Sequence, residues 1–61
     1  MGHIFDTAVW YAKHARTRKS MFPIWRDFTR DLAETFGYRP RVGSWQFREF
    51  VRGWNYGRSG S

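Results

Sequence analysis

No cysteine occurs in this chain, so no disulfide bond can stabilise a domain of only 61 residues. A domain of this size buries only about 60% of the surface that its unfolded chain exposes, and its stability is marginal unless large side chains fill the core. The sequence supplies them: four tryptophans, three tyrosines and six phenylalanines. Each aromatic side chain buries roughly 150–250 Å², so a few of them can hold short helices together. We therefore expect one domain, over residues 1–54, with an aromatic core.

The segment 21–36 carries the clearest helix pattern. Ser20 is a candidate N-cap, and Pro23 falls in the first turn, where its missing N–H costs little. Gly37 stands where a helix commonly ends in a left-handed residue, and Pro40 follows to prevent continuation. A continuous apolar stripe runs along one side of this predicted helix: Met21, Trp25, Phe28, Leu32 and Phe36.

Two further segments show amphipathic helix spacing. In residues 4–16, the side chains of Ile4, Ala8 and Ala12 fall on one face when residues are placed about 100° apart, and the charged side chains lie opposite. In residues 44–54, Ser44 is a candidate N-cap, and the apolar positions follow the i, i+3, i+4, i+7 pattern: Phe47, Phe50, Val51 and Trp54.

Together these segments predict an all-α fold, either a compact three-helix bundle or an orthogonal three-helix array. No alternating apolar and polar run of useful length favours a strand. Residues 55–61 contain two glycines and two serines and are expected to form a short flexible tail. The expected core consists of Ile4, Ala8, Tyr11, Ala12, Ala15, Trp25, Phe28, Leu32, Phe36, Phe47, Phe50, Val51 and Trp54.

The charge of the chain indicates an acidic partner. The formal net charge is +6, and the basic residues comprise nine arginines and two lysines. Arginine offers a planar fork of donors that suits phosphate and carboxylate groups. The candidate partners are thus a nucleic acid, DNA or RNA, or an acidic protein surface. A membrane surface is not favoured, because the apolar stripes are needed for packing between the helices.

The longest apolar run, from Ala8 to Ala12, is far shorter than the about 20 residues of a membrane-spanning helix. With the missing cysteines, this favours a cytoplasmic location. The surplus of aromatic side chains leaves a homodimer open as a further expectation.

The residue inventory does not favour catalysis, a cofactor or a metal site. The serines lie at predicted helix caps or in the expected tail, and both histidines lie on or beside the first predicted helix, away from them. The acidic residues of the segment 21–36 are interleaved with Arg26 and Arg30, which indicates solvent-facing ion pairs rather than a carboxylate site. No Gly-rich phosphate loop, zinc spacing or calcium loop is present.

Two tryptophans depart from the core pattern. On the helical wheel, Trp10 falls about opposite the apolar face of its helix, beside Lys13. Trp45 falls in the sector that Arg48 and Arg52 share, away from the expected core. Exposed aromatic side chains commonly mark binding sites, and binding hot spots favour tryptophan and arginine. The alternative is that the loop at residues 39–43 or the tail at Tyr56 covers either indole and makes a second small core.

These residues predict a non-enzymatic binding protein. The leading hypothesis is contact with nucleic acid, in which arginines contact phosphates and an exposed tryptophan stacks on a base. The alternative is an adaptor or inhibitor whose tryptophan and arginine face docks onto an acidic surface of a larger protein, and Glu49, inside the expected patch, favours it. The candidate binding residues are Trp45, Arg48, Arg52, Arg41, Arg39, Trp10, Lys13, Arg18 and Lys19.

Overall fold

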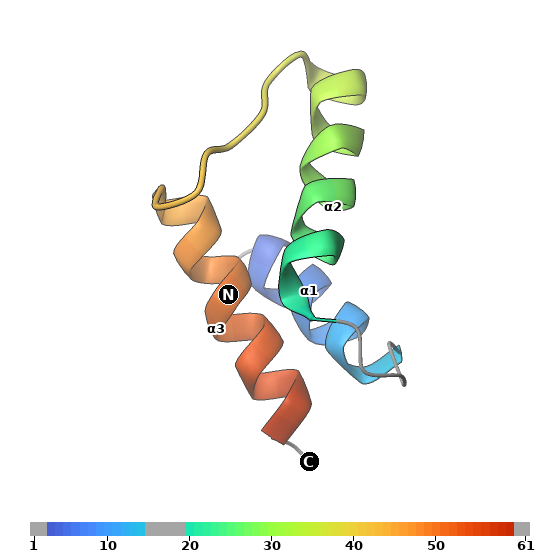
Figure 1. The fold of residues 1–61 in the computed structure, drawn as a ribbon, viewed down its shortest axis with the longest axis vertical. Coiled ribbons are helices and arrows are strands. Elements are labelled where there is room, and N and C mark those ends of the chain that lie inside the picture. The colour runs from blue at the N-terminus through green and yellow to red at the C-terminus, as the bar shows by residue number, and fades with distance from the viewer. Residues whose placement is uncertain (1–2, 15–19, 60–61) are drawn as a thin grey trace.

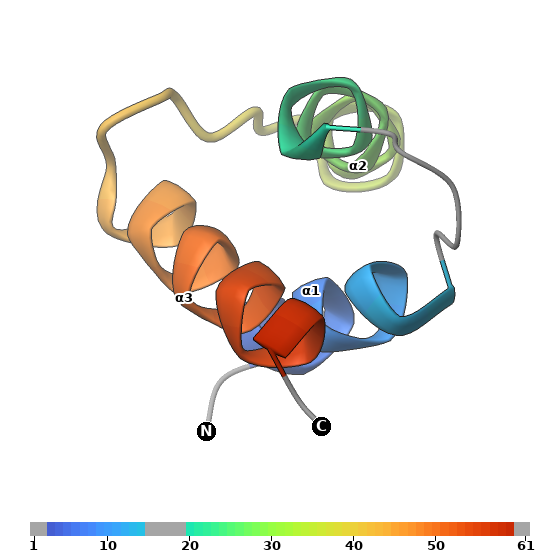
Figure 2. The same cartoon turned by 60° about the horizontal axis from the view of Figure 1, so that its bottom comes forward.

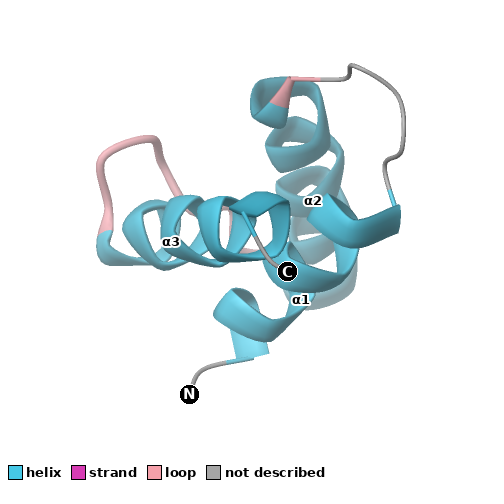
Figure 3. Cartoon of the chain, turned by 90° about the horizontal axis from the view of Figure 1, so that it is seen from below, coloured by secondary structure: helices cyan, strands magenta, loops and turns pink. Residues whose placement is uncertain are grey.

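The structure is a computed structural model that describes residues 3–14 and 20–59. These residues form three helices: α1 (His3–His14), α2 (Met21–Phe36) and α3 (Trp45–Ser59). No strand occurs within these ranges, and the predicted all-α, three-helix fold is confirmed. Helix α1 crosses behind the other two helices in Figure 1, and Figure 3 shows the same arrangement from below.

The ends of the helices agree with most of the predicted caps. Gly37 has a left-handed φ of 73°, and its N–H donates to the carbonyl of Ala33 at 2.8 Å, which closes α2. Ser44 caps α3, since its Oγ accepts a hydrogen bond from the backbone N–H of Phe47 at 3.3 Å. Ser20 has the extended backbone of an N-cap before α2, but its side chain makes no capping hydrogen bond.

The third helix is longer than the sequence predicted. It ends at Ser59 rather than near Trp54, so residues 55–59, expected in a flexible tail, form its last turns. Glycine is a poor helix former, and Gly53 and Gly57 made an early end plausible. Both glycines pack against α1, and this contact offsets their low helix propensity. Residues 15–19 and 60–61 lie outside the described ranges, so the predicted end of the first helix at Arg16 is not tested.

Helices α1 and α3 lie against each other (Figure 2), and small residues at their contact let the two backbones approach closely. A Cβ atom on Gly53 would overlap the carbonyl oxygen of Phe5 and lie 2.9 Å from the Cβ of Ala8. A Cβ atom on Gly57, one turn further along α3, would lie 2.7 Å from the Cβ of Ala12. The distance between two helix axes is set by the side chains at their contact. The pairing of glycine with alanine therefore decides how closely α1 and α3 pack.

Aromatic rings hold α2 against this helix pair. Phe50 of α3 is 0% exposed, and its ring centroid lies 5.2 Å from that of Trp25 and 5.3 Å from that of Phe28, both on α2. Phe47 adds an edge-to-face contact with Trp25 at 5.1 Å. Such tilted and edge-to-face arrangements are the favoured geometries of aromatic pairs. The core thus consists of small side chains between α1 and α3 and of rings between α2 and α3.

Most of the predicted core is confirmed. The buried apolar cluster consists of residues that the helix patterns had assigned to it: Ala8, Ala12, Trp25, Phe28, Phe50 and Trp54. Four more predicted core residues are half-buried and pack against the cluster: Ile4, Tyr11, Leu32 and Phe47. Ile24, which the stripe of α2 had not included, also packs against it.

Three predicted core residues are not confirmed as members of the buried cluster. Phe36 is 73% exposed, because the end of α2 at which it lies rises beyond α1 and α3 (Figure 1). Val51 is only half-buried and does not belong to the buried cluster. Ala15 lies outside the described residues. Helical periodicity fixes the direction of a side chain, but it does not tell whether a neighbouring helix extends far enough to cover that side chain.

Candidate functional site

Trp45 is held at the first residue of α3 by the loop before it. The Ser44 hydroxyl and backbone N–H both donate to the carbonyl of Arg41, at 2.6 and 3.1 Å. Trp45 is 61% exposed, and Trp10 on α1 is 56% exposed, whereas Trp25 and Trp54 are buried. The predicted division of the four tryptophans into two exposed and two buried residues is confirmed. No described loop or tail covers the Trp45 indole.

The α3 face, which we define as Trp45, Arg48, Glu49 and Arg52, carries two exposed arginines of different character. Arg52 forms an ion pair with Glu49, with its terminal nitrogen 3.3 Å from the carboxylate oxygen. Arg48 makes no side-chain hydrogen bond or ion pair with any other described residue. One of the two cations is therefore partly neutralised, and the other is available to a ligand.

Two hollows adjoin the α3 face on the side toward α1. The first, of about 380 Å³, is lined by His3, Ile4, Trp45 and Glu49. The second, of about 480 Å³, is lined by Phe5, Asp6, Val9, Glu49, Arg52 and Tyr56. Glu49 borders both. The lining of the two hollows thus includes two carboxylates, of Asp6 and Glu49, and one guanidinium, of Arg52. Much of the remaining lining is apolar. Of the two arginines of the α3 face, Arg52 lines the second hollow and Arg48 lines neither.

The structure does not bring Trp10 and Lys13 to the α3 face. Helix α3 packs against the side of α1 that carries Ala8 and Ala12. Trp10 is two residues from each of them, about 200° around the helix. Its indole stacks on the ring of His14, with 4.2 Å between the centroids and 19° between the planes. Lys13 is exposed on the same helix. These two predicted binding residues belong to another surface.

The predicted arginines of the loop also divide between two places. Arg41 lies immediately before the turn that caps α3, and its side chain is exposed. Arg39 reaches back to α2 instead, where its Nε donates to the Oγ1 of Thr29 at 3.3 Å. Arg18 and Lys19 lie outside the described residues.

A second basic surface, which the sequence did not predict, lies where Arg39 contacts α2. A hollow of about 340 Å³, here called the arginine hollow, is lined by Pro23, Arg26, Asp27, Arg30 and Arg39. The interleaving of Arg26 and Arg30 with acidic residues predicted surface ion pairs for both arginines. The pair of Arg30 with Asp27 exists, at 3.1 Å. The spacing of Arg26 and Arg30 by four residues was the available signal, but the approach of Arg39 could not be predicted from it.

The described part of the chain offers no recognisable metal centre, since no three His, Cys, Asp or Glu side chains in it are grouped to hold an ion. Within the same residues, no helix is both long enough and apolar enough to cross a membrane.

Comparison of the chain with protein-family models, with curated proteins and with solved structures finds no match.

Proposed function

We propose that this chain binds nucleic acid, without catalysis, through the α3 face. The observation that carries the proposal is an indole that is 61% exposed at the start of a helix whose solvent side also presents Arg48 and Arg52. Exposed indole area adds nothing to the stability of a small domain, whereas it provides a platform on which a base can stack. Stacking of this kind contributes about 1–3 kcal/mol per base.

The arrangement of the charges supports contact with a phosphate backbone. Arg48 lies one turn from Trp45 and Arg52 lies two turns from it, so the three side chains share one side of the helix. Arg41 adds a further exposed cation at the end of the preceding loop. Each guanidinium can donate two parallel hydrogen bonds to phosphate oxygens. A single strand whose backbone follows the arginines would bring one base to the indole.

Salt dependence tests the proposal directly. We expect the logarithm of the affinity to fall linearly with the logarithm of the salt concentration, by about 0.9 per duplex phosphate contacted or about 0.7 on a single strand. Replacement of Arg48 and Arg52 by glutamine should reduce this slope by roughly 1–2 and weaken all sequences alike. Fluorescence anisotropy with labelled single-stranded and duplex oligonucleotides at several salt concentrations measures both quantities.

Matched variants control for charge and for tryptophan loss. Arg58→Gln removes an exposed arginine outside the α3 face and should change the slope less than Arg48→Gln. Trp45→Ala should weaken binding with no change in slope, because stacking releases no ions, and Trp10→Ala should have little effect. Binding no tighter than about 10⁻⁴ M at low salt, which is weaker than ordinary non-specific association, contradicts the proposal.

A gain of affinity is expected from Glu49→Gln. This substitution removes the carboxylate that pairs with Arg52 at 3.3 Å and leaves a second cation available to phosphates. The affinity for an oligonucleotide should rise, and the salt slope should become steeper by about one phosphate contact. Affinity measured at two salt concentrations checks this result. An unchanged affinity would mean that Arg52 does not face the nucleic acid.

A protein partner is the second candidate function, and the two hollows between α1 and α3 favour it. Their lining is rich in apolar side chains, and Asp6 and Glu49 would repel a phosphate backbone on that side. An acidic partner would then pair with Arg48 and Arg52 and insert an apolar group beside Trp45. In that case Trp45→Ala should abolish binding, and salt should act mainly on the association rate.

A further inference from the structure

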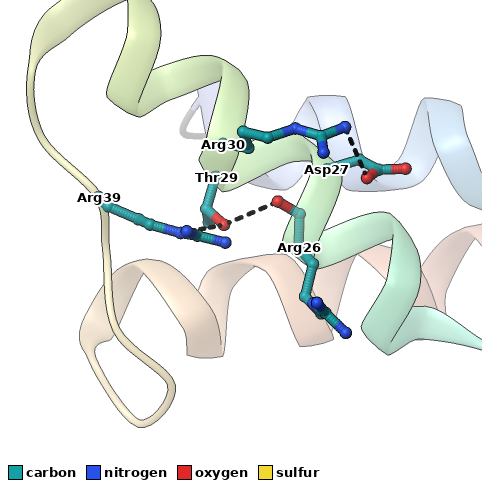
Figure 4. Close-up of polar contacts among 5 residues, drawn as sticks. All are labelled: Arg26, Asp27, Thr29, Arg30 and Arg39. Carbon is teal, nitrogen blue, oxygen red and sulfur yellow. Dashed lines mark hydrogen bonds and ion pairs between the residues drawn. The ribbon is translucent and has the colours of Figure 1, made fainter.

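We propose that the arginine hollow on α2 is a binding site for a phosphate group. Three guanidinium groups and a single carboxylate line it, so its formal charge is +3 from Arg26, Arg30 and Arg39 and −1 from Asp27, or +2 in all. Figure 4 shows the side chain of Arg39 reaching from the loop to Thr29, while Arg30 extends from α2 toward Asp27 and Arg26 extends from α2 in another direction. The site is separate from the α3 face and does not depend on its proposed function.

Thr29 fixes the position of Arg39. Its side chain is 1% exposed, and its hydroxyl donates to the carbonyl of Arg26 at 3.1 Å while it accepts the Nε–H of Arg39 at 3.3 Å. A buried hydroxyl with both partners in place has little freedom to move. Because only Nε of Arg39 is used in this contact, its terminal amino groups remain available to an anion. The guanidinium is therefore positioned before any ligand arrives.

Arg26 and Arg30 complete the site from one side of α2. They are four residues apart, so they lie on neighbouring turns of the same face. Arg26 donates no side-chain hydrogen bond to another described residue. Arg30 pairs with Asp27, but the two side chains are 63% and 65% exposed, and such a pair is weak. A phosphate group can therefore draw Arg30 away from Asp27.

The number and direction of the donors favour phosphate over carboxylate. A carboxylate presents two oxygens in one plane, and their spacing matches the fork of a single guanidinium. A phosphate group presents its oxygens in a tetrahedron and can accept from several guanidinium groups at once. A phosphate monoester carries a charge of about −1.5 to −2 at neutral pH, which matches the formal charge of the hollow. The phosphate can come from a free monoester or from the backbone of a nucleic acid.

Titration with inorganic phosphate tests the site in the full chain. In ¹H–¹⁵N spectra, the Nε–H signals of Arg26, Arg30 and Arg39 should move with one common dissociation constant. The signal of Arg58 serves as the internal control and should move less. A chloride titration at equal ionic strength should leave the three signals nearly unchanged. Equal movement of all arginine signals, or equal responses to phosphate and chloride, would overturn the proposal.

Two exposed substitutions change the charge of the hollow in opposite directions. Arg39→Gln should weaken the binding of inorganic phosphate about tenfold, the loss expected for one hydrogen bond to a charged group. Asp27→Asn should tighten it roughly twofold to fivefold, since it removes an exposed ion pair that competes for Arg30. Arg58→Gln is the charge-matched control. If Arg58→Gln weakens binding as much as Arg39→Gln does, net charge alone explains the effect and the site does not exist.

A third variant tests the positioning of Arg39 without any change of charge. Thr29→Val keeps the shape of the buried side chain but removes the hydroxyl that accepts the Nε–H. The affinity for inorganic phosphate should fall, by less than in Arg39→Gln. Unchanged affinity in a folded Thr29→Val protein, together with no gain in Asp27→Asn, would rule out a preformed site.

Oligonucleotides distinguish the two sources of phosphate and separate this site from the α3 face. If a short strand with a 5′-hydroxyl moves the Arg39 signal, the hollow takes a backbone phosphodiester. If only inorganic phosphate and a 5′-phosphorylated strand move it, the hollow takes a monoester. The Arg48→Gln and Arg52→Gln double variant should leave phosphate binding in the hollow intact. If the α3 proposal is wrong, the double variant does not change the affinity for oligonucleotides, while inorganic phosphate still binds in the hollow. If the present proposal is wrong, inorganic phosphate does not move the three arginine signals together.

Discussion

Replacement of Phe50 by alanine should remove a large share of the protein's stability. Phe50 is 0% exposed and contacts the rings of Trp25 and Phe28, so its truncation leaves a cavity at the junction of α2 and α3. Phenylalanine to alanine substitutions in cores cost about 3–5 kcal/mol. A chain of this length has roughly 3–9 kcal/mol of total stability. Urea denaturation followed by circular dichroism measures the loss.

The matched control is Phe36→Ala, the same substitution at an exposed position of α2. Phe36 is 73% exposed, so its truncation should change the stability by no more than about 0.5 kcal/mol. Helical periodicity alone, in the segments 21–36 and 44–54, predicted that both phenylalanines are core residues. Equal losses in the two variants would show that the end of α2 is covered in solution, either by the chain itself or by a second copy.

Replacement of Gly53 by alanine should destabilise the protein by about 1–3 kcal/mol, the cost of an overpacked contact. The added methyl group would overlap the carbonyl oxygen of Phe5, and a backbone atom cannot move aside by a rotamer change. Helix α1 would have to shift as a whole. The sign of the effect is informative, because alanine is otherwise a better helix residue than glycine by roughly 0.5–1 kcal/mol. Thermal unfolding monitored by circular dichroism measures it.

Asn55→Ala is the control for helix propensity, since Asn55 is an exposed residue of the same helix. This variant should be as stable as the parent chain or slightly more so. Gly57→Ala should be destabilised, as Gly53→Ala is, because its methyl group would lie 2.7 Å from the Cβ of Ala12. A Gly53→Ala protein that is more stable than the parent would show that α1 and α3 do not pack closely at this point.

Local signals predicted the helices well where a cap and a periodic stripe agreed. The bounds of α2 are the predicted ones, because the left-handed Gly37 closes the helix whatever its surroundings are. The predicted end of α3 was wrong, because this end depends on what surrounds the helix. Gly53 and Gly57 weaken a helix when it is judged by propensity alone, and only the presence of α1 shows what these glycines contribute.

In the candidate sites too, some features could be predicted from one helix, and others depend on the packing between elements. The exposure of Trp45 and its alignment with Arg48 and Arg52 follow from the periodicity of one helix, and both could be predicted. The hollows beside them could not, because they require the placement of α1. The arginine hollow joins two residues of α2 to Arg39, and the contact that joins them passes through the buried hydroxyl of Thr29.

The sequence by itself determined the all-helical fold, the bounds of α2, the burial of Trp25 and Trp54 and the exposure of Trp10 and Trp45. These properties depend on the direction of side chains around a single helix axis, which periodicity and caps specify within one segment. The tertiary structure alone decided the close approach of α1 to α3, the exposure of Phe36, the separation of Trp10 from Trp45 and the assembly of the arginine hollow. Each of these depends on which helix faces which and how far it extends, and no pattern within one helix contains that information.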